Sequence, residues 1–150
     1  MRVQALVHRR REDVAIHGQP IETLLDVLKH PVDGVRLRAR IELSARDTGD
    51  VIAAAQKWAA QFDPKAKADA HHLLEALWLH QNHNLVNRDL LKRLLSSPDH
   101  RARAAAGRVL CYWRDQVSDA LELFKGLAAD AHPRVRLEAV RAASFFNAPE

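Results

Sequence analysis

Hydrophobic side chains recur along this chain at intervals of three and four residues, the spacing that places them on one face of an α-helix. The first such stripe follows Pro20, and later ones begin at Thr48, at Asn87 and near Ser118. A second helical segment follows each of them, so the pattern predicts four helical hairpins. The second helices are expected at residues 34–45, 65–82, 99–113 and 133–146.

These second helices also repeat in sequence. Each begins at or shortly after a proline, and the prolines are 33, 34 and 35 residues apart. A basic residue follows each proline, and an alanine stands three positions after the basic residue. The prolines are Pro31, Pro64, Pro98 and Pro133, the basic residues are Arg36, Lys67, Arg101 and Arg136, and the alanines are Ala39, Ala70, Ala104 and Ala139. Because alanine lets helix axes approach closely, we expect the second helices of neighbouring repeats to pack on one another.

A single hairpin cannot bury both of its faces, so repeated hairpins must stack. The sequence therefore predicts an all-α fold, a right-handed α-solenoid of about four hairpins. The repeats are expected at residues 20–46, 48–83, 87–114 and 117–146, within a domain that spans residues 20–150. Residues 1–19 are expected to be an N-terminal extension, which is either a short strand hairpin or a loose linker.

The C-terminal end of the predicted solenoid has no polar capping helix in this sequence. A solenoid end without such a cap exposes an apolar face. Three alternatives are left open by this apolar end. The chain is a piece of a longer array, a partner covers the end, or the chain self-associates through its C-terminal repeat.

The stretch DAHPRVRLEAVRAA resembles the HEAT repeat, whose motif is a turn with Pro or Asp followed by Val-Arg-x-x-Ala on the second helix. SPDHRARAAAGRVL and HPVDGVRLRARIEL are weaker copies, and DPKAKADAHHLLEAL departs further because Ala66 and Lys67 replace Val and Arg. The resemblance covers about residues 20–146. It implies stacked helical hairpins whose second helices line a concave face.

The run HHLLEALWLHQNHNLVNRDLLKRLLSSPDHRARAAAGRVLCYWRD has a narrower resemblance. It is similar to the HEAT segment of large exported proteins of planctomycetes, which combine a membrane-bound dehydrogenase region with a c-type haem domain. This resemblance implies a bacterial protein located in the periplasm or outside the cell; without it, a cytoplasmic location is expected. The chain has no Cys-x-x-Cys-His sequence, so no haem or redox activity follows from it.

Composition narrows the classes of function. The formal net charge is +4 and the isoelectric point is about 9.6, which permits contact with nucleic acid or another anionic surface without requiring it. Cys111 is the single cysteine, so an internal disulfide is excluded. No stretch approaches the roughly 18 consecutive apolar residues of a membrane span, and the first residues lack the apolar segment of a signal peptide.

Candidate chemistry is sparse. The densest histidine cluster does not fit one metal ion, because His72 and His80 lie two helical turns apart, about 12 Å along the axis. The serines lack a Gly-x-Ser-x-Gly elbow, and the glycines do not form a phosphate-binding loop. Asp63, Asp99 and Asp130 fall in turns, where helix capping explains them. We therefore assign no catalytic, cofactor-binding or metal-ligating residue, and we expect a protein without enzymatic activity.

The arginines of the second helices divide into two groups. Those in the repeated column, Arg36, Arg101 and Arg136, are expected to donate hydrogen bonds to carbonyls or caps of neighbouring turns. Contacts with a partner or an anion are expected from the others: Arg38, Arg40, Arg103, Arg108, Arg134 and Arg141. Trp78 and Trp113 are interpreted as equivalent core positions, and Leu137 and Val140 are expected to face the core.

Two functions are compatible with this pattern. The first is a protein–protein interaction or scaffold module without chemistry of its own. The second is a nucleic-acid-binding protein, similar to HEAT-like DNA glycosylases, in which basic second helices line a concave groove.

Overall fold

The computed structural model describes residues 14–146, and this part of the chain is entirely helical. Eight α-helices follow one another without a strand in the described part. They are α2 (Ile21–Val27), α3 (Asp33–Ser44), α4 (Thr48–Ala59), α5 (Ala70–Asn82), α6 (Arg88–Leu95), α7 (His100–Tyr112), α8 (Ala120–Ala128) and α9 (Pro133–Ala143). The strand hairpin considered for residues 1–19 falls largely outside the described residues.

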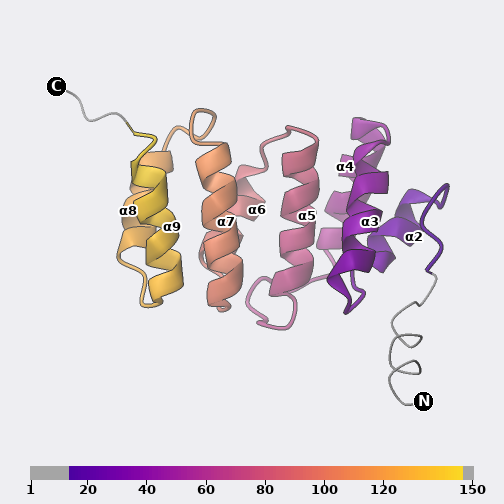
Figure 1. Cartoon of the computed structure of the whole chain (residues 1–150), viewed down its shortest axis with the longest axis horizontal. Coiled ribbons are helices and arrows are strands. Elements are labelled where there is room, and N and C mark those ends of the chain that lie inside the picture. Colours follow the sequence, from indigo (N-terminus) through magenta and orange to yellow (C-terminus); the bar gives the residue numbers. More distant parts are fainter. Residues whose placement is uncertain (1–13, 147–150) are drawn as a thin grey trace, which may run out of the picture.

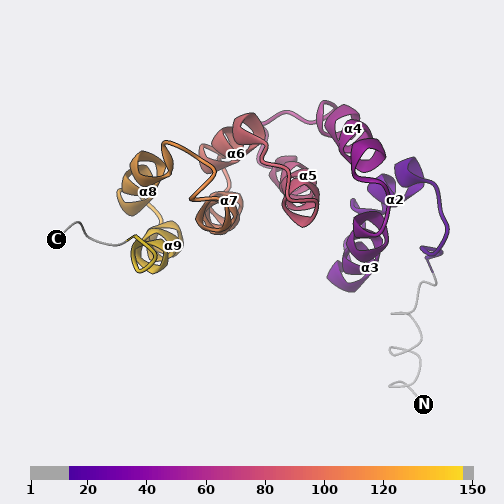
Figure 2. The same ribbon diagram turned by 90° about the horizontal axis from the view of Figure 1, so that it is seen from above.

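The helices form four hairpins that stack side by side into an arch (Figures 1 and 2). The inner helices α3, α5, α7 and α9 line the concave side, and the outer helices α2, α4, α6 and α8 lie behind them (Figure 2). Within each hairpin the two helices pack together, and each inner helix also packs on the next inner helix. The prediction of an all-helical repeat solenoid is therefore confirmed.

The arch curves because small residues occupy the contacts between inner helices. Ala39, Ala76, Ala106 and Ala139 are buried, each at the seventh position of its helix. Gly107 follows this column in α7, and a Cβ atom there would lie 3.1 Å from Leu127 Cδ1. Between the outer helices the buried side chains include the large Trp58, Leu91 and Phe124.

Helix starts follow ordinary capping chemistry. The side chains of Asp47, Asn87, Asp99 and His132 each accept a hydrogen bond from a backbone N–H in the first turn of the next helix. The second hairpin differs from the prediction, because α5 begins at Ala70 rather than near residue 65. Residues 63–69 form turns instead, in which Asp63 Oδ1 accepts a hydrogen bond from the Lys65 N–H at 2.8 Å.

The predicted register of the repeat columns is wrong in two of the four repeats. Counted from the first residue of each inner helix, the fourth position holds Arg36, Leu73, Arg103 and Arg136, and the seventh holds Ala39, Ala76, Ala106 and Ala139. Lys67 precedes its helix, and Arg101, Ala70 and Ala104 lie off these columns. The prolines do not share one helical register, because Pro133 is the first residue of α9 whereas Pro98 lies before the cap of α7.

Candidate interaction surface on the inner helices

The fourth-position arginine ties α3, α7 and α9 to the turns that precede them, whereas α5 has Leu73 at this position. Arg36 Nη1 donates to the carbonyls of His30 and Pro31 at 2.7 and 3.0 Å. Arg136 Nη1 makes the same pair of contacts in the last repeat, with distances of 2.8 and 2.9 Å. Arg103 Nη1 donates to the Ser97 carbonyl at 2.8 Å. The repeated arginine is thus a structural residue that satisfies carbonyls at the turn.

Two junctions between repeats are bridged by ion pairs. Glu75 on α5 is fully buried and accepts from Arg40 at 2.8 Å and from Arg36 at 3.2 Å, which joins the first and second repeats. Glu138 holds the same sixth position on α9, and it accepts from Arg108 of the third repeat at 2.7 Å. These carboxylates are buried at the junctions and are paired there with arginines.

A third bridge joins the turns of the last two repeats. Arg103 Nε and Nη2 donate to the two carboxylate oxygens of Asp130 at 2.7 and 2.9 Å. The hydrogen bonds from Arg103 lower the pKa of Asp130, and Asp130 raises the pKa of Arg103. Arg103 was expected to be free for a partner, and this pairing corrects that expectation. Arg103 holds the fourth position of α7, the repeated position that the sequence analysis assigned to Arg101. Arg101 itself is exposed.

The junction between the second and third repeats is different. Among the described residues, no ion pair crosses it. Helix α5 packs on α6 and α7 mainly through apolar side chains, including the fully buried Leu77 and Leu110. Polar contacts there are limited to Asn87 with His80 at 3.1 Å and Tyr112 with Asn84 at 3.3 Å.

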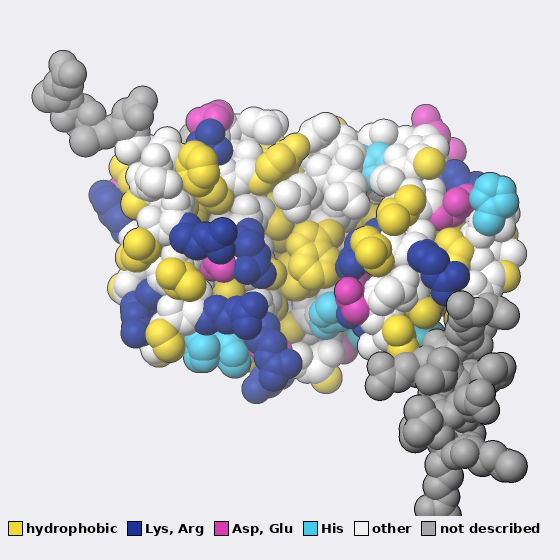
Figure 3. All heavy atoms as spheres, viewed as in Figure 1, with side chains coloured by type: hydrophobic (Ala, Val, Ile, Leu, Met, Phe, Trp, Pro, Cys, Tyr) yellow, Lys and Arg dark blue, Asp and Glu magenta, His cyan; other side chains and the backbone are white. Residues whose placement is uncertain are grey.

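Over α7 and α9 the concave surface is basic (Figure 3). Four exposed arginines at the second and ninth helical positions form what we call the arginine frame: Arg101, Arg108, Arg134 and Arg141. Arg101 and Arg134 make no ion pair with a described residue, and Arg141, 67% exposed, lies 3.9 Å from Glu138. Glu138 is 6% exposed, so little negative charge reaches the surface here.

A groove of about 310 Å³ lies between the C-terminal halves of α7 and α9. Tyr112 and Phe145 are exposed at its sides, and Arg108 and Arg141 line it. The Arg114 guanidinium lies over the Phe145 ring, 5.0 Å from its centroid, which helps to hold the ring in place. Cys111 is half-buried and also lines this groove.

Over α3 and α5 the concave surface is more apolar. A groove of about 430 Å³, which we call the apolar groove, lies between these helices. Leu37, Ile41 and Trp78 line it, together with the polar side chains of Arg40, Ser44 and Asn82. Ile41 is 60% exposed, which is unusual for a large aliphatic side chain in a helix that packs on two neighbours. The Arg40 guanidinium, held by Glu75, lies 5.1 Å from the Trp78 ring centroid and fixes that ring.

Two further expectations from the sequence, for apolar residues of α9 and for the tryptophans, are wrong. Leu137 and Val140 were expected in the core but are 53% and 68% exposed, because the core side of α9 is formed by Val135, Ala139 and Ala142. Trp78 and Trp113 are not equivalent: Trp78 is the ninth residue of α5, whereas Trp113 follows α7 and is fully buried.

Arg38 and Arg134 are exposed, as a contact residue must be. Arg38 occupies on α3 the sixth position that Glu75 and Glu138 hold on α5 and α9. No hydrogen-bond or ion-pair partner of Arg38 is found among the described residues.

The histidines of the second repeat have structural partners. His80 Nδ1 contacts the Ala76 carbonyl at 2.9 Å, and His83 bridges Thr48 and the Leu43 carbonyl at 3.0 and 3.2 Å. The His72 ring packs against Trp58 and Phe62, and burial lowers its pKa. Within residues 14–146, no group of three or more His, Cys, Asp or Glu side chains could hold a metal ion.

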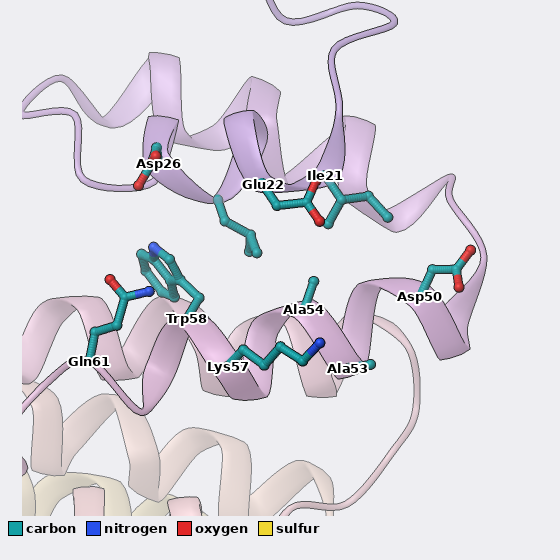
Figure 4. A pocket seen from close by; sticks show the side chains of 10 residues that line it. Ile21, Glu22, Asp26, Asp50, Ala53, Ala54, Lys57, Trp58 and Gln61 are labelled. Atoms are coloured by element: carbon teal, nitrogen blue, oxygen red, sulfur yellow. The ribbon is translucent and has the colours of Figure 1, made fainter.

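The convex side has grooves between outer helices. One, of about 450 Å³, separates α2 from α4 and is lined by Glu22, Asp26, Asp50 and Lys57, with the Trp58 ring at one end (Figure 4). The Trp58 Nε1 atom is buried without a hydrogen-bond partner. The charges lining this groove are of both signs, so it has no clear preference for one class of ligand.

The last hairpin presents an apolar end. Leu121, Val140 and Phe146 surround a pocket of about 260 Å³ between α8 and α9 whose lining is almost entirely apolar. Residues 147–150, which follow, lie outside the described part of the chain. None of the described helices combines the length and apolar character that a membrane span requires.

Comparison with known proteins supports the family-level resemblance. The family model of HEAT repeats matches residues 87–150, the segment that contains α6 to α9. Neither the comparison with curated proteins nor the comparison with solved structures gives a match. The narrower resemblance to exported redox proteins receives no support from these comparisons.

Proposed function

We propose that the protein is a non-catalytic binding module that holds a segment of a protein partner against its inner helices. HEAT repeats in general mediate protein interactions, and the concave surface offers side chains suited to this role. The observation that carries the proposal is the division of polar groups on this surface. Glu75 and Glu138 are buried in the junctions, whereas arginine, aromatic and aliphatic side chains face outward. Arginine and aromatic side chains are enriched at protein interfaces.

Nucleic-acid binding is the second candidate, and the arginine frame is the observation that favours it. A phosphate backbone needs positive charge along its whole path. The frame covers α7 and α9 only, while on the corresponding face of α3 the apolar Leu37 and Ile41 accompany a single exposed arginine, Arg38. The basic surface is therefore too short to serve a strand that crosses all four inner helices, and protein binding is favoured.

The test is selection from a random peptide library displayed on phage. Enriched peptides should bind the wild-type protein and lose most of their affinity for Leu137→Asp, on the concave surface. Leu85→Asp is the matched control, since Leu85 is 43% exposed and lies in the turn between α5 and α6, outside the grooves of the concave surface. If peptides are not enriched, or if both variants bind them equally, the proposal is wrong.

A further inference from the structure

We propose that the partner segment is an extended peptide with acidic residues at one end and bulky apolar residues at the other. Its carboxylates would lie on the arginine frame, and its apolar side chains would fill the apolar groove. This inference rests on the proposed function, because it specifies the chemistry of the segment that the concave surface holds.

The arginine frame has the geometry of a carboxylate-binding surface. The two arginines on each helix are seven residues apart, which places them on one face and separates them by about 10 Å along the axis. Neighbouring helices lie about 8–10 Å apart, so the four guanidiniums form an approximately square arrangement. Each guanidinium can bind a carboxylate in a bidentate manner. The buried Glu138 engages Arg108 at 2.7 Å but leaves Arg101 and Arg134 without a partner in the described chain.

The apolar groove is prearranged for a large side chain. Trp78 is fixed between the Arg40 guanidinium and the His71 ring, whose centroid is 6.2 Å from it. Arg40 is in turn fixed by both oxygens of the buried Glu75, each at 2.8 Å. Because these side chains are already held in place, an apolar group can enter without a large loss of side-chain entropy.

The separation of the two surfaces sets the length of the peptide. From α3 to α9 there are three steps between neighbouring inner helices, or roughly 25–30 Å at the usual packing distance. An extended chain advances about 3.3 Å per residue, so about eight or nine residues cross the surface. The order of the peptide is fixed by the protein, since the two ends of the concave face are chemically different.

The experiment uses three fluorescent peptides of about twelve residues with one composition. One has its Asp and Glu residues first and its Leu and Trp residues last, the second has the reverse order, and the third is shuffled. One ordered peptide should bind at least about tenfold more tightly than the shuffled one, and its affinity should fall as salt rises. A benzophenone at its apolar end should crosslink to α3 or α5.

Matched variants locate the two contacts. The double variant Arg101→Gln and Arg134→Gln should weaken binding of the ordered peptide about tenfold and remove most of its salt dependence. Ile41→Asp should weaken it similarly but leave the salt dependence. Arg93→Gln, which alters an exposed arginine on the outer helix α6, should leave binding unchanged. Circular dichroism checks that each variant is folded.

The outcomes separate this inference from the proposed function. Equal binding of ordered and shuffled peptides overturns the inference, while library peptides that depend on Leu137 still support a concave binding site. Failure of both experiments overturns both proposals. Single-stranded DNA that binds more tightly than every peptide, and depends on Arg101 and Arg134, would replace them with nucleic-acid binding.

Discussion

At the scale of single residues, two arginines of the same helix have different roles because they point to different sides of it. Arg101 and Arg103 are two residues apart in α7 and therefore point in different directions. Arg103 joins the Ser97 carbonyl to the carboxylate of Asp130, whereas Arg101 extends to solvent. The sequence motif alone does not distinguish them, because both are followed by alanine.

We expect Arg103→Ala to lower the free energy of unfolding by about 2 kcal/mol, because it removes charge-assisted hydrogen bonds and leaves Asp130 and the Ser97 carbonyl unpaired. Arg101→Ala should change it by less than about 0.5 kcal/mol, as expected for an exposed side chain without a partner. Urea unfolding followed by circular dichroism measures both. Equal effects of the two substitutions would contradict this assignment.

At the scale of helices, the apolar period predicted the element types well and the start of α5 poorly. The stripes gave all eight helices of the described chain, because burial on one face is the main determinant of an amphipathic helix. Pro64 predicts a helix start, but α5 begins later because Asp63 and Asp69 organise a turn over residues 63–69.

The interaction surface was harder to predict than the helices. Arg38, Arg134, Arg108 and Arg141 were identified from sequence and are indeed exposed. The exposure of Leu137 and Ile41 could not be predicted, because an apolar residue beside a helical stripe is normally read as core. Which apolar side remains open depends on how neighbouring repeats pack, and the sequence does not contain that information locally.

Glycines in the helices provide a test of how repeats pack. Gly126 in α8 has open space where a Cβ atom would lie, so Gly126→Ala should raise the free energy of unfolding by about 0.5–1 kcal/mol through helix propensity. Gly107→Ala should gain less or destabilise, because its Cβ would lie 3.1 Å from Leu127 Cδ1 and 3.5 Å from Glu138 Cβ. Thermal melts of both variants measure these changes. A larger rise in melting temperature for Gly107→Ala than for Gly126→Ala would contradict the prediction.

At the scale of the whole molecule, stability should decline in acid in two stages. Burial lowers the pKa of His72, His80 and His100 below the ordinary value of 6.5. The unfolded chain therefore binds protons first, and stability falls as the pH drops from about 7 to 5. The pKa of Asp130 is also lowered from its ordinary value of 3.8. The stability that its ionised carboxylate contributes is therefore present above this pH and is lost as the pH falls further.

Urea unfolding at pH 8, 6, 5 and 3 measures this profile, and a flat profile between pH 8 and 5 would contradict the first stage. A variant tests the contribution of His80. Asn87 Oδ1 accepts from the Leu90 N–H at 3.0 Å, which directs its amide nitrogen toward His80 Nε2. Asn87→Asp keeps the helix cap but offers an acceptor to protonated His80, so the decline between pH 7 and 5 should become smaller.

The junction between the second and third repeats, which has no ion pair among the described residues, divides the arch into two ion-paired halves. Ion pairs and hydrogen bonds are directional, so they hold the first repeat to the second and the third to the fourth in one register. Apolar contacts are not directional, and packed helices can slide over them by small amounts without breaking a bond. Apolar packing thus sets the register between the two pairs of repeats, while ion pairs set it within each pair.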